Sequence, residues 1–218
     1  MQELAELKQS VVLYGRQMAD RGLVAGTWGN ISLRSNVGNR IAITPSGQPY
    51  SELTPEDIVV VDTVGNVLEG RRPSSELPLH LAIYTARADV RAIVHTHSLY
   101  ATACAVAGEA IPPSLEEMVQ VVGGSVDVAR YALPGTADLA SYAVEALGDK
   151  TAVLLSNHGA VACGPSLKEA LLIAELVEKA AHIHVIARQL GGARCLSDDD
   201  VQLMRRFYVE TYSNPNRK

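Results

Sequence analysis

The sequence predicts an α/β fold in which a mainly antiparallel sheet is flanked by helices, and three observations support this. Apolar residues recur at helical spacing in several segments, the longest of which is 166–190. Short apolar runs rich in β-branched residues lie among these segments and are bounded by turn residues. The 218 residues, 47% of them hydrophobic, suffice for one sizeable core and contain no linker, repeat or low-complexity segment. We therefore expect a single domain over residues 1–218.

Helices are expected where apolar residues recur every three to four positions. Hydroxyl side chains cap the first turn of a helix, and glycine readily adopts the left-handed conformation that ends one. The residues expected to begin or end helices in this way are Ser74 or Ser75, Thr136, Ser197, Gly22 and Gly148. The predicted helices cover residues 2–20, 74–87, 99–108, 135–147, 166–190 and 196–212.

Strands are expected where short apolar runs lie between turn residues. The turn sequence at 36–39 joins two strands in a hairpin, and Gly65 and Asn66 lie at the turn of a second pair. A later apolar run is interrupted at 157–159, which predicts two strands around a tight turn. The expected strands lie at residues 31–35, 40–46, 54–70 (two strands), 90–98, 125–133 and 151–164 (two strands).

Charge and cysteine content argue against several classes of protein. The net charge is −5 and no block of Lys and Arg stands out, so nucleic acid and anionic membranes are not expected partners. The first 22 residues lack the features of a secretory signal, and no apolar run approaches the ~20 residues that span a bilayer. Three widely spaced cysteines do not suggest a disulfide framework. We expect a cytoplasmic protein with Cys104 in its core.

His95 and His97 stand one residue apart in a predicted strand. Alternate residues of a strand point to the same face, so the two imidazoles are expected side by side, as two ligands of a divalent metal ion. His182 and His184 have the same spacing in a predicted helix, where residues two apart point about 200° apart around the axis. They cannot share an ion, and we expect structural or surface roles for them.

His158 is a candidate third ligand, because it precedes Gly159 at the break between two predicted strands. Three imidazoles with an open fourth position are typical of catalytic zinc; the alternative for His158 is a turn residue bonded to the backbone. Glu76, at a helix start beside hydroxyl groups, is the best candidate base, although first-turn carboxylates commonly serve only the helix dipole. His80, one turn further on, is expected to pack or hydrogen-bond near the site rather than bind metal.

Three segments combine glycine or proline with small hydroxyl or amide side chains: TWGNIS at 27–32, TPSG at 44–47 and PSSE at 73–76. Such loops offer backbone N–H groups and short donors to an anion, and the helix start after the third segment adds its dipole. No GxxxxGK[ST] motif is present, so a nucleotide P-loop is excluded. Each segment alone is typical of a turn, but all three together with the histidines indicate a small phosphorylated ligand.

Seven short motifs follow one another along the chain: TWGNIS, ITPSG, PSSE, HTH, GG, NHG and LSD. In this order they resemble the motifs of the class II aldolase/adducin family, and within it those of the zinc-dependent L-fuculose 1-phosphate aldolases. The match spans most of the chain, and the combination is specific although each motif is short. The resemblance implies a three-layer α/β/α fold with a central, mostly antiparallel sheet. It also implies a homotetramer with active sites at subunit interfaces.

The resemblance implies roles for individual residues as well. His95, His97 and His158 would bind one Zn²⁺, or another divalent ion, per subunit. Glu76 would be the acid/base. The phosphate would be bound by Thr27, Gly29, Asn30, Ser46, Gly47, Ser74 and Ser75. The implied reaction is the reversible aldol cleavage of a ketose 1-phosphate to dihydroxyacetone phosphate and an aldehyde, with the metal stabilising the enediolate.

The chain departs from the aldolase pattern at a tyrosine that lies just before the paired glycines in the family and protonates the aldehyde oxygen. Here the segment reads SLEEMVQVVGG, which places Glu116 or Glu117 at that position. A carboxylate acts as an acid there only if its pKa is raised. Glu117 is our candidate for this role. A further family tyrosine near the C-terminus corresponds to Tyr208 or Tyr212.

Two alternatives to an aldolase are consistent with the sequence. The first is a sister enzyme of the same fold: a pentulose-phosphate 4-epimerase, a sugar-acid phosphate decarboxylase or a thiosugar-phosphate dehydratase. The epimerases resemble the chain in HTHS but typically have Asp where Glu76 stands, which favours the aldolase. The second is a non-catalytic, adducin-like assembly module, which has no reason to keep three metal ligands, a base and a phosphate-binding site together.

Overall fold

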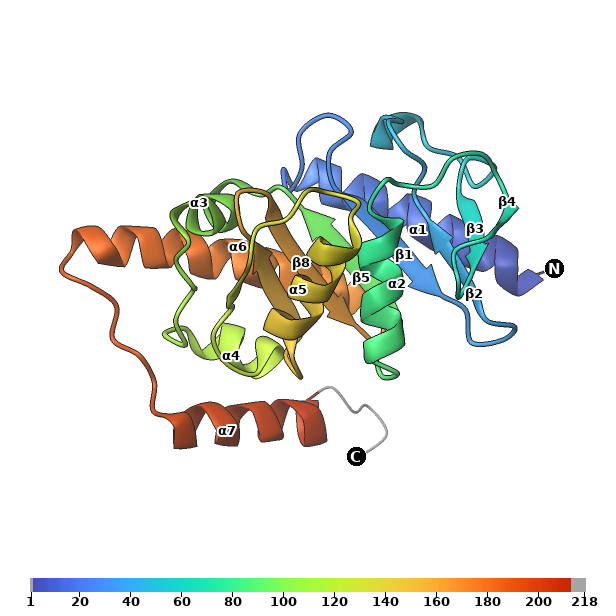
Figure 1. The fold of residues 1–218 in the computed structure, drawn as a ribbon. Coiled ribbons are helices and arrows are strands. Elements are labelled where there is room, and N and C mark those ends of the chain that lie inside the picture. Colours follow the sequence, from blue (N-terminus) through green and yellow to red (C-terminus); the bar gives the residue numbers. More distant parts are fainter. Residues whose placement is uncertain (1, 213–218) are drawn as a thin grey trace.

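Eight strands form one sheet in the computed structural model, which describes residues 2–212 (Figure 1). The strands are β1 (Asn30–Arg34), β2 (Arg40–Ile43), β3 (Val59–Asp62), β4 (Val67–Glu69), β5 (Ala92–Thr96), β6 (Val128–Ala129), β7 (Ala152–Leu155) and β8 (Gly159–Gly164). Their order in the sheet is β4-β3-β2-β1-β5-β8-β7-β6. Neighbours run antiparallel except for β6 and β7, which are parallel, so the predicted mainly antiparallel sheet is confirmed.

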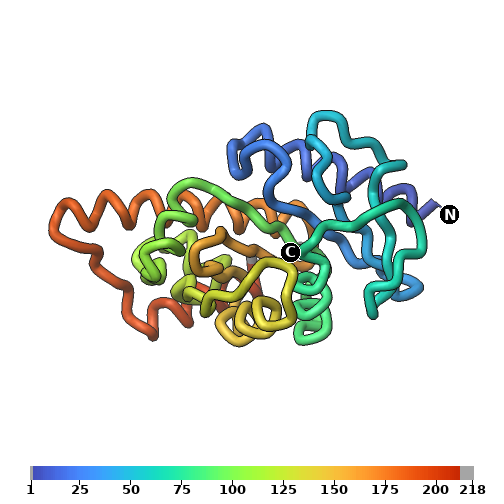
Figure 2. Tube along the Cα trace, turned by 45° about the horizontal axis from the view of Figure 1, so that its top comes forward, coloured from blue at the N-terminus to red at the C-terminus, as the bar shows by residue number. Residues whose placement is uncertain are grey.

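Helices cover both faces of the sheet and give the molecule three layers (Figures 1 and 2). The helices are α1 (Gln2–Asp20), α2 (Leu77–Ala86), α3 (Leu99–Ala107), α4 (Glu116–Val122), α5 (Ala137–Leu147), α6 (Leu167–Gln189) and α7 (Asp198–Phe207), with a short 3₁₀ helix η1 (Tyr50–Glu52) and a π-helical turn η2 (Tyr208–Tyr212). α2 and α5 pack together on one face. α1, α3 and α6 cover the other face, where Cys104 is buried as predicted, and α7 packs on α4.

The register of the central strands brings distant parts of the chain to one end of the sheet. β1 pairs with β5 so that Asn30 lies opposite His95, and β5 pairs with β8 so that Thr96 lies opposite Ala160. The backbones approach so closely that a Cβ atom on Gly159 would lie 2.3 Å from the carbonyl oxygen of Thr96, a position that only glycine can occupy. The start of β1, the end of β5 and the turn before β8 therefore meet.

Two of the predicted helix caps are confirmed. The side chains of Thr136 and Ser197 accept hydrogen bonds from the backbone N–H groups of Leu139 and Asp200, in the first turns of α5 and α7. α1 ends at the predicted point, with Gly22 in the left-handed region at φ 70°. Local capping chemistry therefore sets these boundaries.

The predicted cap of α2 is wrong. α2 begins at Leu77, later than a cap at Ser74 or Ser75 would allow, and the residue before it is Glu76, whose side chain makes no capping bond. Ser74 still belongs to the sheet edge, because its backbone N–H donates to the carbonyl of Thr44 (3.0 Å). Its Oγ accepts from the N–H of Glu76 (3.2 Å) instead. Glu76 thus stands at the boundary between extended chain and helix.

Two further elements differ from prediction. The strand expected at 125–133 is reduced to β6, because Val126 pairs with Ile111 in an isolated bridge while Val128 and Ala129 pair with β7. α4 was not expected; three of its seven residues are β-branched valines, which are more typical of strands. The polar residues 213–218 lie outside the described residues.

Candidate active site

The residues that the sequence assigns to metal, base and phosphate surround one pocket at this end of the sheet. The pocket is lined by Thr27, Trp28, Gly29, Asn30, Pro45, Ser46, Gly47, Ser74, Ser75, Glu76, His97, Pro134 and His158. His95 is fully buried behind it, in contact with Glu76 and His97. All the candidate residues are therefore brought together, with the exception of Glu117.

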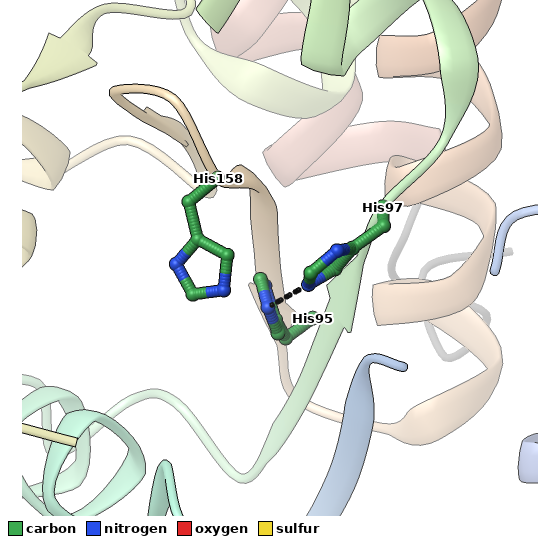
Figure 3. A group of neighbouring side chains, drawn as sticks. All are labelled: His95, His97 and His158. Atoms are coloured by element: carbon green, nitrogen blue, oxygen red, sulfur yellow. Dashed lines mark hydrogen bonds between the residues drawn. The ribbon is translucent and has the colours of Figure 1, made fainter. Parts of the chain in front are cut away.

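Three imidazoles face one another at the pocket (Figure 3), with ring centroids 4.8 to 4.9 Å apart. The Nε2 atoms of His95 and His97 are 3.0 Å apart, and ring nitrogens of all three residues lie within 4.8 Å of one another. His95 lies near the end of β5, and His97 directly follows the strand. His158 comes from the turn between β7 and β8, where Asn157 adopts φ 57°, a conformation that asparagine tolerates well.

The orientation of His95 suits a metal ligand. Its Nδ1 lies 3.0 Å from the carbonyl oxygen of Ala160, so Nδ1 carries a proton and donates it, and Nε2 faces the other two imidazoles. Such a bond to the far nitrogen is the usual support of a metal-binding histidine. Two nitrogens on a tetrahedral zinc ion at about 2.0 Å lie about 3.3 Å apart. The 3.0 Å between the Nε2 atoms of His95 and His97 is close to this.

Glu76 is a buried carboxylate between the imidazoles. Its Oε2 accepts from Nδ2 of Asn30 (2.7 Å) and lies 3.0 Å from Nε2 of His95, while Oε1 lies 3.3 Å from Nε2 of His158. Burial raises the pKa of Glu76, but the charge and hydrogen bond of His95 outweigh it and hold the pKa well below its usual range. Oε1 has no hydrogen-bond partner among the described residues. A buried, unsatisfied carboxylate oxygen beside three imidazoles fits a cation.

The protonation of the other two imidazoles also fits a metal. Burial, together with the charge of His95, lowers the pKa of His97 to about 3 and that of His158 to about 4. Both rings are therefore neutral at pH 7, which is the form that binds a metal ion. The charge of Glu76 raises the pKa of His95 in spite of its burial, so a proton and a metal ion compete for its Nε2.

The loop before β1 is pressed against β5. Gly29 has φ 77°, and a Cβ atom there would lie 2.6 Å from the carbonyl oxygen of His95 and 2.6 Å from a methyl group of Val24. Tyr50, itself buried, donates from its hydroxyl to the carbonyl oxygen of Gly29 (2.7 Å). The backbone of this loop is thus fixed at the pocket, where its N–H groups and the facing hydroxyls of the 44–47 and 73–76 segments suit an anion.

The two carboxylates and Tyr208, which were candidates to complete the site, lie elsewhere in this chain. Glu117 is on α4 and forms an exposed ion pair with Lys179, and Glu116 is exposed on the same helix. Tyr208 is buried, and its hydroxyl donates to a carboxylate of α6. The side chain of Tyr212 lies outside the described residues. Glu117 and Tyr208 are not among the residues that line the pocket.

His182 and His184 lie on α6, away from the three-histidine cluster. The ring of His182 stacks on Tyr100 with centroids 3.7 Å apart, and Nε2 of His184 lies 3.2 Å from a carboxylate oxygen of Glu109. His182 therefore packs on α3 and His184 makes a polar contact with the loop after α3, which fits the structural or surface roles expected from their helical spacing.

Trp28 is a pocket residue for which no role was predicted from the sequence. Its side chain is 66% exposed, and its ring lies 5.7 Å from that of His97. The only signal in the sequence is a large aromatic residue between Thr27 and Gly29, inside a loop of small residues.

Comparison with known proteins identifies the family. Residues 9–185 match the class II aldolase and adducin N-terminal domain. The chain belongs to the class II aldolase and adducin family. It is 39% identical over 206 residues to 5-deoxy-D-ribulose 1-phosphate aldolase of Bacillus thuringiensis, covering 94% of this chain and 96% of that protein. It is 35% identical over 204 residues to L-fuculose phosphate aldolase of Escherichia coli, covering 93% and 94%.

A solved structure gives the same result for this class II aldolase family member. An L-fuculose 1-phosphate aldolase matches with a TM-score of 0.91 and 41% identity, covering 94% of this chain and 96% of that one. The fold class and the resemblance predicted from the sequence are confirmed, and the chain is a lyase of the aldolase type. Within residues 2–212, no helix is both long and apolar enough to cross a membrane.

Proposed function

We propose that this protein catalyses the reversible, zinc-dependent aldol cleavage of a ketose 1-phosphate to dihydroxyacetone phosphate and a small aldehyde. The observation that supports this is the convergence of three imidazoles, a buried carboxylate and three loops suited to an anion on one pocket. Zinc is the proposed ion because three neutral imidazoles with an open position are its usual catalytic ligand set. Another divalent ion is the alternative.

The substrate type follows from the relatives. One is named for 5-deoxy-D-ribulose 1-phosphate and another for L-fuculose phosphate, so the proposed substrate is a ketose 1-phosphate of this kind. Both sugars end in a methyl group. The exposed ring of Trp28 and the ring of Pro134 line the pocket and offer apolar surface to such an end.

The side chains of the pocket divide the reaction between them. A divalent ion held by the three imidazoles would supply Lewis acidity toward the substrate carbonyl. In cleavage, the hydroxyl beside the breaking carbon–carbon bond gives its proton to a base, for which Glu117 is proposed below, and becomes the aldehyde carbonyl, while the bonding electron pair moves toward the substrate carbonyl group. Glu76 in its protonated form then gives its proton to the carbon that stays with the phosphate, and the Glu76 carboxylate removes that proton in the reverse direction. The loops containing Gly29, Ser46 and Ser74 hold the phosphate.

Glu117 is the proposed acid for the aldehyde oxygen. It is exposed on its own chain and does not line that chain's pocket. We therefore propose a homotetramer in which active sites lie at subunit interfaces, so that Glu117 of one chain serves the pocket of another. A cytoplasmic location is part of the same proposal.

The test is an assay of the purified, zinc-loaded protein with 5-deoxy-D-ribulose 1-phosphate, L-fuculose 1-phosphate and other ketose 1-phosphates. Release of dihydroxyacetone phosphate is expected from at least one of them. Failure to release a triose phosphate from every member of the panel would reject the aldolase. Conversion of a pentulose phosphate to an isomer of equal mass would point to the sister epimerases instead.

A further inference from the structure

A buried chain of hydrogen bonds leads away from Glu76 into the core. Asn30 Nδ2 lies 2.7 Å from Glu76 Oε2, and Asn30 Oδ1 lies 2.5 Å from His80 Nε2. His80 Nδ1 lies 2.6 Å from Ser32 Oγ, which in turn lies 2.7 Å from the hydroxyl of Tyr84. None of the five residues is more than 5% exposed. The bonds are therefore shielded from competition with water.

The hydrogen bonds of this buried series all run in one direction, with each donor on the side away from Glu76. A carboxylate only accepts, so the Asn30 atom beside Glu76 is the NH₂ group, and its oxygen faces His80. Nε2 of His80 must then carry a proton and donate it. A neutral imidazole has only one N–H group, so Nδ1 accepts from the hydroxyl of Ser32. Ser32 in turn accepts from Tyr84. Each member fixes the proton position of the next.

We propose that His80 is a positioning residue, which holds the side-chain amide of Asn30 so that an N–H group is donated to Glu76. Without the Nε2–H group of His80, the amide of Asn30 is free to rotate by half a turn and present its oxygen to the carboxylate. This inference rests on the proposed function, because it gives Glu76 the role of acid/base.

Asn30 connects two parts of the site. Its NH₂ group has two hydrogens, of which Glu76 takes one, and Asn30 also lines the pocket beside Gly29 and Ser74. The second hydrogen is available to the substrate phosphate. The amide that His80 orients thus contacts both the proposed base and the proposed phosphate site. A change in the orientation of this amide should therefore alter the rate of the chemical step more than it alters the affinity for the metal ion.

The test is a double-mutant cycle between His80 and Asn30 on the zinc-loaded protein. His80→Phe keeps the ring shape and removes both hydrogen bonds, and we expect kcat to fall roughly 10- to 100-fold with zinc content unchanged. Asn30→Ala is expected to raise KM as well. If His80 acts through Asn30, the double variant is no slower than Asn30→Ala alone. His80→Gln, whose amide can donate to Asn30, should recover most of the lost kcat.

A matched control separates positioning from stability. Ile83→Ala removes buried volume from the same helix without touching the chain of hydrogen bonds, so it should lower the melting temperature and leave kcat unchanged. Should His80→Phe fail to fold, Ser32→Ala tests the same chain, because it removes the donor that fixes the proton of His80. Reduced kcat in that variant is expected, and an unchanged kcat would reject the inference.

The inference and the proposed function can fail separately. Two results would overturn the positioning role alone, provided that the wild type is active. One is that the effects of His80→Phe and Asn30→Ala are independent, and the other is that the His80→Phe variant has normal kcat. Binding of phosphoglycolohydroxamate, an enediolate mimic, gives a second readout by calorimetry. The same cycle applied to its affinity should show non-additive losses. A wild type that neither cleaves a ketose 1-phosphate nor binds this compound would reject the proposed function itself.

Discussion

Replacing Gly29 by alanine tests whether the close contact between the loop and β5 sets the geometry of the site. A Cβ atom at this position would lie 2.6 Å from the carbonyl oxygen of His95, about 0.8 Å inside the 3.4 Å at which ordinary contact begins. The loop or the strand must move by a comparable distance. His95 provides a proposed zinc ligand, so the movement reaches the metal centre directly.

Gly38→Ala is the matched control. Gly38 has φ 80°, close to the 77° of Gly29, but a Cβ atom there meets nothing within 4 Å. Both variants bear the cost of a left-handed non-glycine residue, about 1–2 kcal/mol. Gly29→Ala adds an overpacking cost of about 1–3 kcal/mol. For a chain of this size, Gly29→Ala should therefore melt roughly 2–12 °C below Gly38→Ala.

The assay combines melting of the metal-free protein with turnover of the zinc-loaded protein. A misplacement approaching 1 Å costs about 100-fold in rate, so we expect kcat/KM of Gly29→Ala to fall by about that factor. Gly38→Ala should keep wild-type turnover. If the two variants match in both melting temperature and kcat/KM, the contact between Gly29 and His95 does not constrain the site and the reasoning is refuted.

Four further predictions concern the metal, the acid/base and pH. Glu76→Gln should retain zinc, measured by atomic absorption, and lose about 10²–10⁴-fold in kcat; loss of zinc would instead make Glu76 an essential ligand. His97→Ala should lose activity while its metal-free melting temperature stays close to that of wild type. Zinc at 100 times its Kd should stabilise wild type by about 2.7 kcal/mol but should not stabilise His97→Ala. Equal stabilisation of both proteins by zinc would argue against binding at the three histidines. The folded pKa of His97, about 3, lies below its ordinary value of about 6.5. The unfolded chain therefore takes up the extra proton as pH falls through 6.5, and metal-free wild type should lose more melting temperature between pH 7 and pH 5 than His97→Ala. Glu117→Gln should lower kcat without changing zinc content, and unchanged kcat would remove Glu117 from the mechanism.

Two members of the three-histidine cluster could be predicted to lie together because the geometry that joins His95 and His97 is local. In a strand, the period of two places His95 and His97 side by side whatever the rest of the fold does. A glycine after His158 signals the turn that brings the third imidazole to the sheet end. The same local logic separates this pair from the pair on α6.

The connections beyond the ligands depend on contacts between distant segments. The pairing of Asn30 with His95 joins strands that are 65 residues apart in the chain. No local pattern encodes it, so the amide of Asn30 was assigned only to phosphate. Similarly, α4 is helical because Met118 and its valines pack against α6 and α7, which outweighs their weak helix propensity.

The order of the sheet divides the chain into two consecutive halves. Strands β1–β4 are neighbours of one another, strands β5–β8 are neighbours of one another, and within the sheet the two sets of strands are joined by the pairing of β1 with β5. The pocket lies on this seam, with Asn30 from one half and His95 and His158 from the other. Each half contains its own strand pairings, and the three imidazoles come together within the second half when β5 pairs with β8, whereas Asn30 and the anion-binding loop reach them only when the seam closes. Recovery of the proposed zinc binding during refolding would therefore report the pairing of β5 with β8, and recovery of turnover would report the closing of the seam.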